Sequence, residues 1–176
     1  MDNLQFLYLP NSSPKEVQIA LRDNSTGKIL GHVYAIAEDV GKEGGKSYSG
    51  GKIPGGYINY ETSGEYVKRA KPHMYVDDLF VTKEARHKGL GSKLLGKIVQ
   101  ESENRGFKGR IILFAGNTRD VSPLPFYYKL GFRSGDKYIN HQIEKALAAP
   151  KPMNNLVQSF MALSKNGIKE LLKSVR

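Results

Sequence analysis

The segment from residue 74 to residue 114 constrains the fold of this chain more than any other part of the sequence. Residues 74–81 read as a strand, and from Leu90 onward apolar side chains recur at helical spacing, with Gly106 as the stop. Residues 111–114 form an uninterrupted apolar run, which is typical of a strand covered on both faces. A strand, a helix and a second strand within about forty residues predict a βαβ unit with a parallel pair of strands.

The turn between this first strand and the helix contains two glycines and three basic residues, in the order Arg86-His87-Lys88-Gly89-Leu90-Gly91. Glycine lets the backbone pack closely around a ligand, and a helix N-terminus offers unpaired N–H groups at the positive end of the helix dipole. These features indicate a pocket for an anion such as a pyrophosphate. A solvated turn without a ligand is the alternative. The turn lacks the Gly-Lys-Ser/Thr ending of a nucleotide-hydrolysing P-loop and the third glycine of a dinucleotide fingerprint.

Composition narrows the class of protein. A length of 176 residues suits one domain, and 39% hydrophobic with 25% charged residues is typical of a globular chain. The formal net charge of +10 attracts anions such as nucleic acid, an acidic membrane or a phosphate-rich ligand, with solubility alone as the alternative. The absence of cysteine excludes disulfides, thiolate metal sites and a cysteine nucleophile, and the four histidines show no metal-ligand spacing. With no membrane-spanning run and no secretory signal, we expect a cytoplasmic protein without a metal.

The N-terminal part of the chain predicts three strands followed by a long loop. Strands are expected at residues 4–9, 17–21 and 29–37, the last two as a hairpin. Residues 39–72 contain eight glycines among 34 residues, interleaved with tyrosines. Glycine at this density opposes helix, so we expect a long loop or an irregular hairpin there.

The C-terminal part predicts helices around one short strand. Proline at position 123 opens a short helix that runs to Leu130, and a strand begins at Phe132. From His141 the composition is helical, with apolar helical faces on either side of Gly167. The residues on those faces are Leu156, Phe160, Ile168, Leu171, Leu172 and Val175.

Two signatures in the sequence resemble those of the GNAT superfamily of acetyl-CoA-dependent N-acetyltransferases. The Arg/Gln-x-x-Gly-x-Gly/Ala signature matches at Arg86, Gly89 and Gly91. The Phe-Tyr-x-Lys-x-Gly-Phe signature matches at Phe126, Tyr127, Lys129, Gly131 and Phe132. Both occur in the family order and near the family spacing, and the resemblance covers residues 29–135 well.

The resemblance implies an α/β (α+β) fold with a mixed central sheet flanked by helices. The N-acetyltransferase domain would span residues 1–140. A C-terminal helical extension over residues 141–176 would pack on the domain or pair with a second subunit as a homodimer.

The resemblance also implies a site for acetyl-CoA as cosubstrate. The pantetheine arm would lie between the strand at 74–81 and the strand at 111–114. Backbone groups of Leu79, Phe80 and Val81 would pair with the arm and polarise the thioester carbonyl. Asn117 matches the family asparagine that often contacts the arm, although its distance along the chain from Tyr127 is longer than usual. The pyrophosphate would bind the turn formed by Arg86, His87, Lys88, Gly89, Leu90, Gly91 and Ser92.

Tyr127 matches the family tyrosine that protonates the departing CoA thiolate. The chemistry agrees, because a thiolate leaving group needs an acid and a tyrosine beside the thioester can supply the proton. Packing alone is the alternative role, and we assign that role to the neighbouring Tyr128.

The attacking amine must lose a proton, and Asp77 and Asp78 are the candidates for the base. An ordinary ammonium has a pKa of about 10.4, so a base assists at neutral pH. Successive strand residues face opposite sides, so only one of the two carboxylates is expected to point into the cleft. A β-bulge in this strand would change which of the two does so. We choose Asp77, because some family members, diamine acetyltransferases among them, use an acidic residue there. Binding of a cationic substrate or of neighbouring lysines is the alternative role for both. Outside candidates are Glu61, Glu65 and His73.

The sequence departs from the family pattern before its second strand. The family usually places two helices there, and they often help to form the acceptor pocket. Here only residues 10–16 separate the first two strands, so this first helical layer is reduced or missing. The loop over residues 39–72 would take its place as a substrate wall or lid, with a plain surface excursion as the alternative.

The sequence therefore predicts an N-acetyltransferase that moves an acetyl group from acetyl-CoA to a primary amine by direct attack in a ternary complex. The acceptor is a small amine or the amine of a protein or peptide, and the carboxylates at positions 77 and 78 favour a cationic one. The alternative is a non-catalytic module of the same fold that binds CoA, nucleic acid or a protein partner. Nucleic acid and membrane are not expected as partners, because no stacked-aromatic RNA signature or recognition helix stands out.

Overall fold

The structure is a computed structural model that describes residues 3–38, 51–53, 56–58, 71–116, 122–149, 156 and 158–175. The chain divides into two units.

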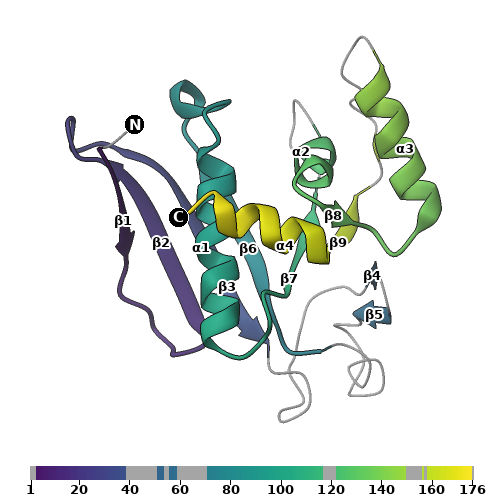
Figure 1. The fold of residues 1–176 in the computed structure, drawn as a ribbon, viewed down its shortest axis with the longest axis horizontal. Coiled ribbons are helices and arrows are strands. Elements are labelled where there is room, and N and C mark those ends of the chain that lie inside the picture. Colours follow the sequence, from purple (N-terminus) through teal and green to yellow (C-terminus); the bar gives the residue numbers. More distant parts are fainter. Residues whose placement is uncertain are drawn as a thin grey trace. The chain divides into compact units, whose positions relative to one another are not determined.

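Four antiparallel strands form the basis of the first unit, which comprises Met1–Glu38, His73–Ile111 and Lys169–Arg176. The strands lie side by side (Figure 1) as β1 (Leu4–Tyr8), β2 (Glu16–Asp23), β3 (Ile29–Glu38) and β6 (His73–Val81). A single 3-10 turn, η2 (Lys83–Ala85), follows β6 and precedes α1 (Leu90–Asn104). The predicted hairpin of β2 and β3 is confirmed, and no helix lies between β1 and β2, as the sequence predicted.

Alternation of apolar side chains determines which face of this sheet is buried. In β2 the side chains of Val17, Ile19 and Leu21 are buried, and α1 packs against β2, β3 and β6 with Leu94 and Ile98 fully buried. Burying a leucine or isoleucine side chain stabilises the fold by about 1.5–3 kcal/mol. The core of the unit therefore lies between α1 and this face, and the opposite face of β3 and β6 carries polar and aromatic side chains.

The C-terminal residues of the chain pack against α1. Helix α4 (Lys165–Lys173) ends in this unit, and a Cβ atom on Gly96 of α1 would lie 2.6 Å from the carbonyl oxygen of Leu171. Only glycine permits so close an approach. The Ser174 hydroxyl lies 3.3 Å from the carbonyl oxygen of Ser92, and Lys93 Nζ donates to the carbonyl oxygen of Ser174 over 3.4 Å.

The second unit comprises Asp39–Pro72 and Ile112–Ile168. Its elements are β4 (Gly51–Ile53), β5 (Gly56–Ile58), β7 (Ile111–Ala115), α2 (Leu124–Lys129), β8 (Phe132–Arg133), α3 (Lys137–Ala148), β9 (Ser159–Leu163) and the start of α4. Strand β9 pairs antiparallel with both β7 and β8, and β4 pairs with β5. A Cβ atom on Gly131 would lie 2.7 Å from the Cα of Gly167, so the turn after α2 packs closely on the start of α4.

The prediction of a helical C-terminal extension is wrong for residues 159–163, which form β9. The four-residue spacing of Leu156 and Phe160 suggested a helical face. The segment Ser-Phe-Met-Ala-Leu is instead a short, almost fully buried run with a paired strand on each side. Periodicity alone does not separate a buried strand from a buried helix in so short a run. Helix α3 also begins four residues before His141, because the Asp136 carboxylate accepts the backbone N–H of Tyr138 (2.8 Å) and caps the helix.

The strands follow the order β1-β2-β3-β6-β7-β9-β8 in a seven-stranded sheet, with β4 and β5 as a separate pair. Strand β6, helix α1 and strand β7 follow one another along the chain as the predicted strand, helix and strand. The fold class expected from the sequence, an α+β mixed sheet flanked by helices, is confirmed.

Candidate active site

The turn from Arg86 to Ser92 has the backbone geometry of an anion cradle. His87 (φ 62°) and Gly89 (φ 73°, ψ 8°) are both left-handed, and helical Leu90 follows directly. A left-handed residue next to a helical one turns successive N–H groups toward the same point, a concavity that binds anions. The first bond of α1 runs from the N–H of Lys93 to the carbonyl of Gly89, and no side chain in the described part of the chain caps the helix. The N–H groups of residues 90–92 precede that first bond, so they are positioned to bind a phosphate.

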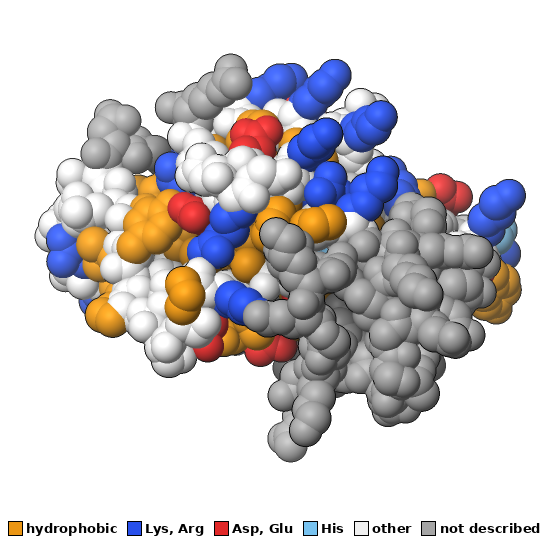
Figure 2. Space-filling model, turned by 90° about the horizontal axis from the view of Figure 1, so that it is seen from below, with side chains coloured by type: hydrophobic (Ala, Val, Ile, Leu, Met, Phe, Trp, Pro, Cys, Tyr) orange, Lys and Arg blue, Asp and Glu red, His pale blue; other side chains and the backbone are white. Residues whose placement is uncertain are grey.

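Basic side chains surround this cradle. Arg86, His87 and Lys88 are exposed, whereas Leu90 and Gly91 are buried under the turn. Arg86 Nε donates to the carbonyl oxygen of Val81 over 3.1 Å, which ties the turn to the end of β6. Figure 2 shows a face of the molecule on which Lys and Arg side chains gather, in keeping with the net charge of +10. The charge of the turn therefore adds to the attraction of its N–H groups for an anion.

The end of β6 contains the predicted arm-binding residues. In the register with β3, Leu79 lies opposite Val33, Phe80 opposite His32 and Val81 opposite Gly31. The Phe80 side chain is 43% exposed, which is unusual for a phenylalanine in a sheet.

A β-bulge at Asp77 interrupts the pairing of β6 with β3. Tyr34 pairs with Asp78 and the next residue, Ala35, pairs with Val76, so Asp77 is the extra residue. Side chains alternate across a regular strand, and a bulge breaks that alternation. As a result both carboxylates, at positions 77 and 78, are exposed, where a regular strand would present one of them.

Asp77 influences two tyrosines near the bulge. The pKa of Tyr75 is raised to about 12 by burial, by Asp77 and by Glu38. Burial, together with Glu16 and Asp77, also raises the pKa of Tyr34. Both shifts favour the neutral phenol, because a phenolate here would be desolvated and repelled by carboxylates.

We expect the free energy of unfolding to fall as the pH rises from 10 to 12. The pKa of Tyr75 is about 12 in the folded chain against an ordinary value of 10.0. The unfolded chain therefore loses the phenol proton first, so this stabilisation is complete below pH 10 and is lost toward pH 12. Urea unfolding across this range should show a shallower decline for Tyr75→Phe. An unchanged decline in that variant would contradict the assignment. Tyr8→Phe should also make the fall in the free energy of unfolding shallower, because burial and Glu101 raise the pKa of Tyr8 to about 12 as well.

Histidine 32 is a site residue that the sequence reasoning missed. Its Nε2 lies 2.7 Å from the Asp78 carboxylate, and its ring stacks on Phe80 with centroids 5.4 Å apart. The only signal in the sequence is a polar side chain at an alternating position of an apolar strand. Its partner stands 46 positions later, and only the register of β3 with β6 brings the two together.

Tyr127 lies in the second unit, on α2. Its half-buried ring contacts Phe126 and Phe132, with centroid distances of 5.1 and 5.7 Å. The helix begins at Leu124, one residue after the predicted start at Pro123, and Gly131 follows it in the left-handed region (φ 94°). Packing against two aromatic rings fixes the position of the Tyr127 ring on α2.

Tyr128 is held by neighbours of its own. Its hydroxyl donates to Glu144 of α3, and the Arg133 guanidinium lies 3.7 Å from the centre of its ring. Burial and the hydrogen bond to Glu144 raise the pKa of Tyr128. These contacts tie α2 to α3, which is the packing role expected for this residue.

Several predicted residues lie outside the described part of the chain. These are Asn117, Glu61, Glu65 and most of the loop over residues 39–72. His73 is described, and its side chain is buried at the start of β6.

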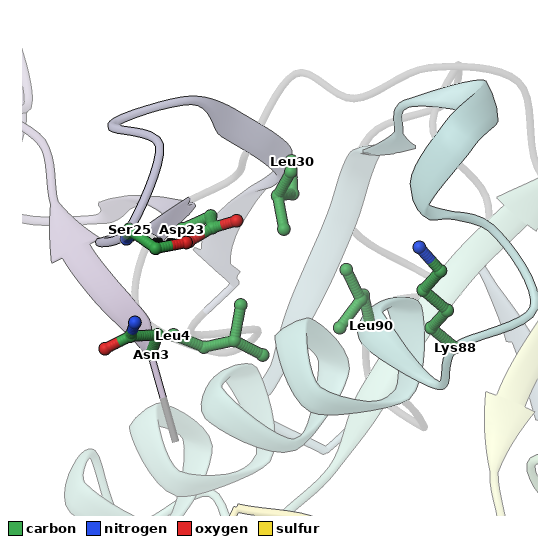
Figure 3. Close-up of a pocket in the computed structure, with 7 residues that line it drawn as sticks. All are labelled: Asn3, Leu4, Asp23, Ser25, Leu30, Lys88 and Leu90. Carbon is green, nitrogen blue, oxygen red and sulfur yellow. Dashed lines mark hydrogen bonds between the residues drawn. The ribbon is translucent and has the colours of Figure 1, made fainter. Parts of the chain in front are cut away.

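A cavity of about 440 Å³ lies beside the start of α1 (Figure 3). The Asp23 carboxylate in its wall accepts hydrogen bonds from the Ser25 hydroxyl (2.5 Å) and backbone N–H (2.8 Å), which lower the pKa of Asp23. The cavity shares Lys88 and Leu90 with the turn at residues 86–92, and the Asp23 carboxylate would repel a diphosphate that lay against the opposite wall. Neither Tyr127 nor Asp77 is among its described lining residues. These residues are Asn3, Leu4, Asp23, Ser25, Leu30, Lys88 and Leu90.

The described residues contain neither a metal-binding cluster nor a membrane-spanning helix. No group of three or more His, Asp or Glu side chains among them could hold a metal ion. None of the described helices is long and apolar enough to span a membrane.

Comparisons with known proteins agree with this fold. Residues 4–132 match the Acetyltransferase (GNAT) family, whereas a search of curated proteins finds no relative. Among solved structures, a mutant AtaT toxin bound to the C-terminus of the antitoxin AtaR is 12% identical, with a TM-score of 0.52, over 97% of this chain and 98% of that one. The KacTA–DNA complex is 15% identical, with a TM-score of 0.50, over 92% of this chain and 76% of that one.

These structural likenesses concern the fold alone, because the identities are low. The family match covers most of the chain, including the glycine turn and both tyrosines of α2. The chain therefore belongs to the GNAT acetyltransferase family and is an acyltransferase.

Proposed function

We propose that this protein is an N-acetyltransferase that moves the acetyl group of acetyl-CoA to a primary amine by direct attack in a ternary complex. The observation that carries the proposal is the anion cradle at residues 86–92, within the family's own signature. The sequence contains no cysteine to carry an acetyl group, which favours direct transfer. Residues 1–140 would form most of the N-acetyltransferase domain, and β9 at Ser159–Leu163 would complete its sheet.

In this proposal the backbone N–H groups and basic side chains of the turn bind the pyrophosphate of acetyl-CoA. Backbone groups of Leu79, Phe80 and Val81 pair with the pantetheine arm. Asn117 contacts the arm as well, by its match to the family. Acetyl-CoA supplies the acetyl group and a thiolate leaving group. Tyr127 then protonates the CoA sulfur, which makes departure of the thiolate easier.

The acceptor in this proposal is a cationic amine. Asp77 and Asp78 are both exposed beside the arm-binding segment of β6. Two carboxylates there attract an ammonium group and stabilise it near the thioester. Asp77 is the carboxylate that we proposed as the base from the sequence, and its place at the bulge leaves it accessible to the acceptor.

Calorimetric titration of the purified protein tests the proposal. We expect acetyl-CoA to bind more tightly than ADP, because ADP offers the pyrophosphate without the arm. Equal affinities would indicate phosphate attraction only. Failure of acetyl-CoA to bind at moderate salt would favour the non-catalytic alternative. In that case a steep fall of nucleic-acid binding with salt would identify a nucleic-acid partner. When acetyl-CoA binds, a panel of amines with acetyl-CoA defines the acceptor.

A further inference from the structure

We propose that the imidazole of His32, oriented by Asp78, accepts the proton of the acceptor amine. This inference rests on the proposed function and names a catalytic residue that the family signatures do not include. Asp78 acts on the reaction through His32, so it is a positioning residue. In this inference His32 takes the role of base that the sequence analysis gave to Asp77, and Asp77 attracts the ammonium charge of the acceptor.

Two contacts hold the His32 ring in one orientation. Asp78 Oδ2 lies 2.7 Å from His32 Nε2, and the Phe80 ring stacks against the imidazole with an angle of 27° between their planes. A carboxylate can only accept, so Nε2 donates its hydrogen and Nδ1 keeps a lone pair. Within the described part of the chain, Nδ1 makes no hydrogen bond. The side chain is 44% exposed, so the ring is open to an acceptor from solvent.

The register places His32 beside the strand segment that pairs with the pantetheine arm in the proposed function. His32 lies directly opposite Phe80, and Phe80 is the middle residue of the segment that pairs with the arm in the proposed function. Side chains directly opposite each other in antiparallel strands have Cβ atoms about 4.5–5.5 Å apart. An imidazole at this position therefore lies beside the strand segment that binds the thioester in the proposed function.

The charged and titratable groups around His32 are mostly acidic. On β6 they are Asp78 and, one residue before it, Asp77, and on β3 the next such group is Tyr34. On β2 His32 pairs with Ala20, and the nearby Arg22 is engaged with Gln5 (2.6 Å) and Asn24 (3.3 Å). The two carboxylates, Asp77 and Asp78, therefore attract a cation toward His32.

Imidazole suits the proton transfer better than a carboxylate does. Reference pKa values are about 3.9 for aspartate, 6.5 for histidine and 10.4 for an alkylammonium. A base works best when its own pKa lies near the operating pH, which favours histidine over aspartate at neutral pH. A carboxylate that fixes the tautomer of a histidine base is a recurrent arrangement in hydrolases.

The acceptor ammonium carries three hydrogens, and the amide product keeps one of them. His32 Nδ1 takes the first proton, which frees the nitrogen lone pair, and later returns it to solvent through the exposed edge of the ring. The nitrogen then attacks the thioester carbon, the C–N bond forms and the C–S bond breaks. The second proton leaves the nitrogen and replaces the one that the acid gives to the CoA sulfur.

The first test compares two amine probes in the full-length protein. n-Butylamine is an ammonium ion at neutral pH, whereas hydroxylamine is already unprotonated and needs no base before attack. We expect His32→Gln to lower kcat/KM for n-butylamine by about a hundredfold and to remove the acid limb of its pH profile. The same variant should show a far smaller decrease in kcat/KM for hydroxylamine. Equal losses with both probes would overturn the proposal, because they would indicate a structural role.

Matched variants separate the roles of the neighbouring groups. His141→Gln removes an exposed histidine of α3 that lies 3.9 Å from Glu144, and we expect it to keep the wild-type profile. Asp78→Asn should lose rate with n-butylamine as His32→Gln does. Asp77→Asn should raise KM for n-butylamine and keep the acid limb. Removal of the acid limb by Asp77→Asn, with the limb retained in His32→Gln, would overturn the proposal in favour of Asp77.

Two measurements need no turnover. Nitrogen-15 NMR of the neutral histidine rings should show the hydrogen of His32 on Nε2, and a neutral ring with its hydrogen on Nδ1 would overturn the proposal whatever the acceptor is. Calorimetry should show acetyl-CoA binding unchanged in His32→Gln. Failure of the wild-type protein to bind acetyl-CoA would instead overturn the proposed function, so the two failures are distinguishable.

Discussion

Replacing Tyr127 by phenylalanine is expected to lower kcat by roughly 10²–10⁴-fold, the usual contribution of a general acid. The substitution removes only the hydroxyl, and the ring keeps its contacts with Phe126 and Phe132. Without that hydroxyl the CoA thiolate departs without a proton donor, so the barrier to C–S cleavage rises. The affinity for acetyl-CoA should stay at its wild-type value, because the hydroxyl acts on the leaving group. Steady-state kinetics and calorimetry on the same preparation measure both quantities.

Tyr128→Phe is the matched control, one residue away on the same short helix. It removes the hydrogen bond to Glu144 and keeps the ring against Arg133. We expect it to lower the free energy of unfolding by about 1 kcal/mol and to leave kcat unchanged. A wild-type kcat in Tyr127→Phe would exclude Tyr127 as the acid. A large loss of kcat in Tyr128→Phe, with Tyr127→Phe active, would transfer the role to Tyr128.

The parts of the fold that the sequence predicted are those set by local pattern. Helix α1 combines helical spacing of leucines with a glycine at each end, and β2 alternates buried and half-buried residues along its length. The turn at residues 86–91 was predicted because its glycines and charges are contiguous in the chain. For such segments the information that determines the structure lies within the segment itself.

The parts that the sequence did not predict depend on partners far along the chain. Strand β9 is a strand because β7 and β8 pair with its two edges, and nothing local separates it from a helix. The bulge at Asp77 and the pairing of His32 with Asp78 depend on the register of β3 with β6, which the sequence does not state. A slip of one residue in that register would have turned His32 to the face of α1.

Gly89→Ala is expected to weaken acetyl-CoA binding by roughly 10–150-fold. Gly89 is left-handed at φ 73°, and alanine there costs about 1–2 kcal/mol of backbone strain. If the turn relaxes to escape that strain, its N–H groups no longer converge on the pyrophosphate. Loss of one hydrogen bond to a charged group costs about 1.5–3 kcal/mol, which is the source of the expected range. Calorimetric titration with acetyl-CoA measures the change.

Gly106→Ala separates loss of binding from loss of stability. Gly106 ends the same helix at φ 76°, and a Cβ atom would meet nothing within 4 Å at either glycine. Both variants therefore carry similar backbone strain without a steric clash, and we expect similar decreases in the free energy of unfolding. Only Gly89 lies in the anion cradle, so only Gly89→Ala should lose affinity for acetyl-CoA. Equal affinities in the two variants would mean that the cradle does not hold the pyrophosphate. A difference between them would locate the cosubstrate at this end of α1 whichever amine is the acceptor.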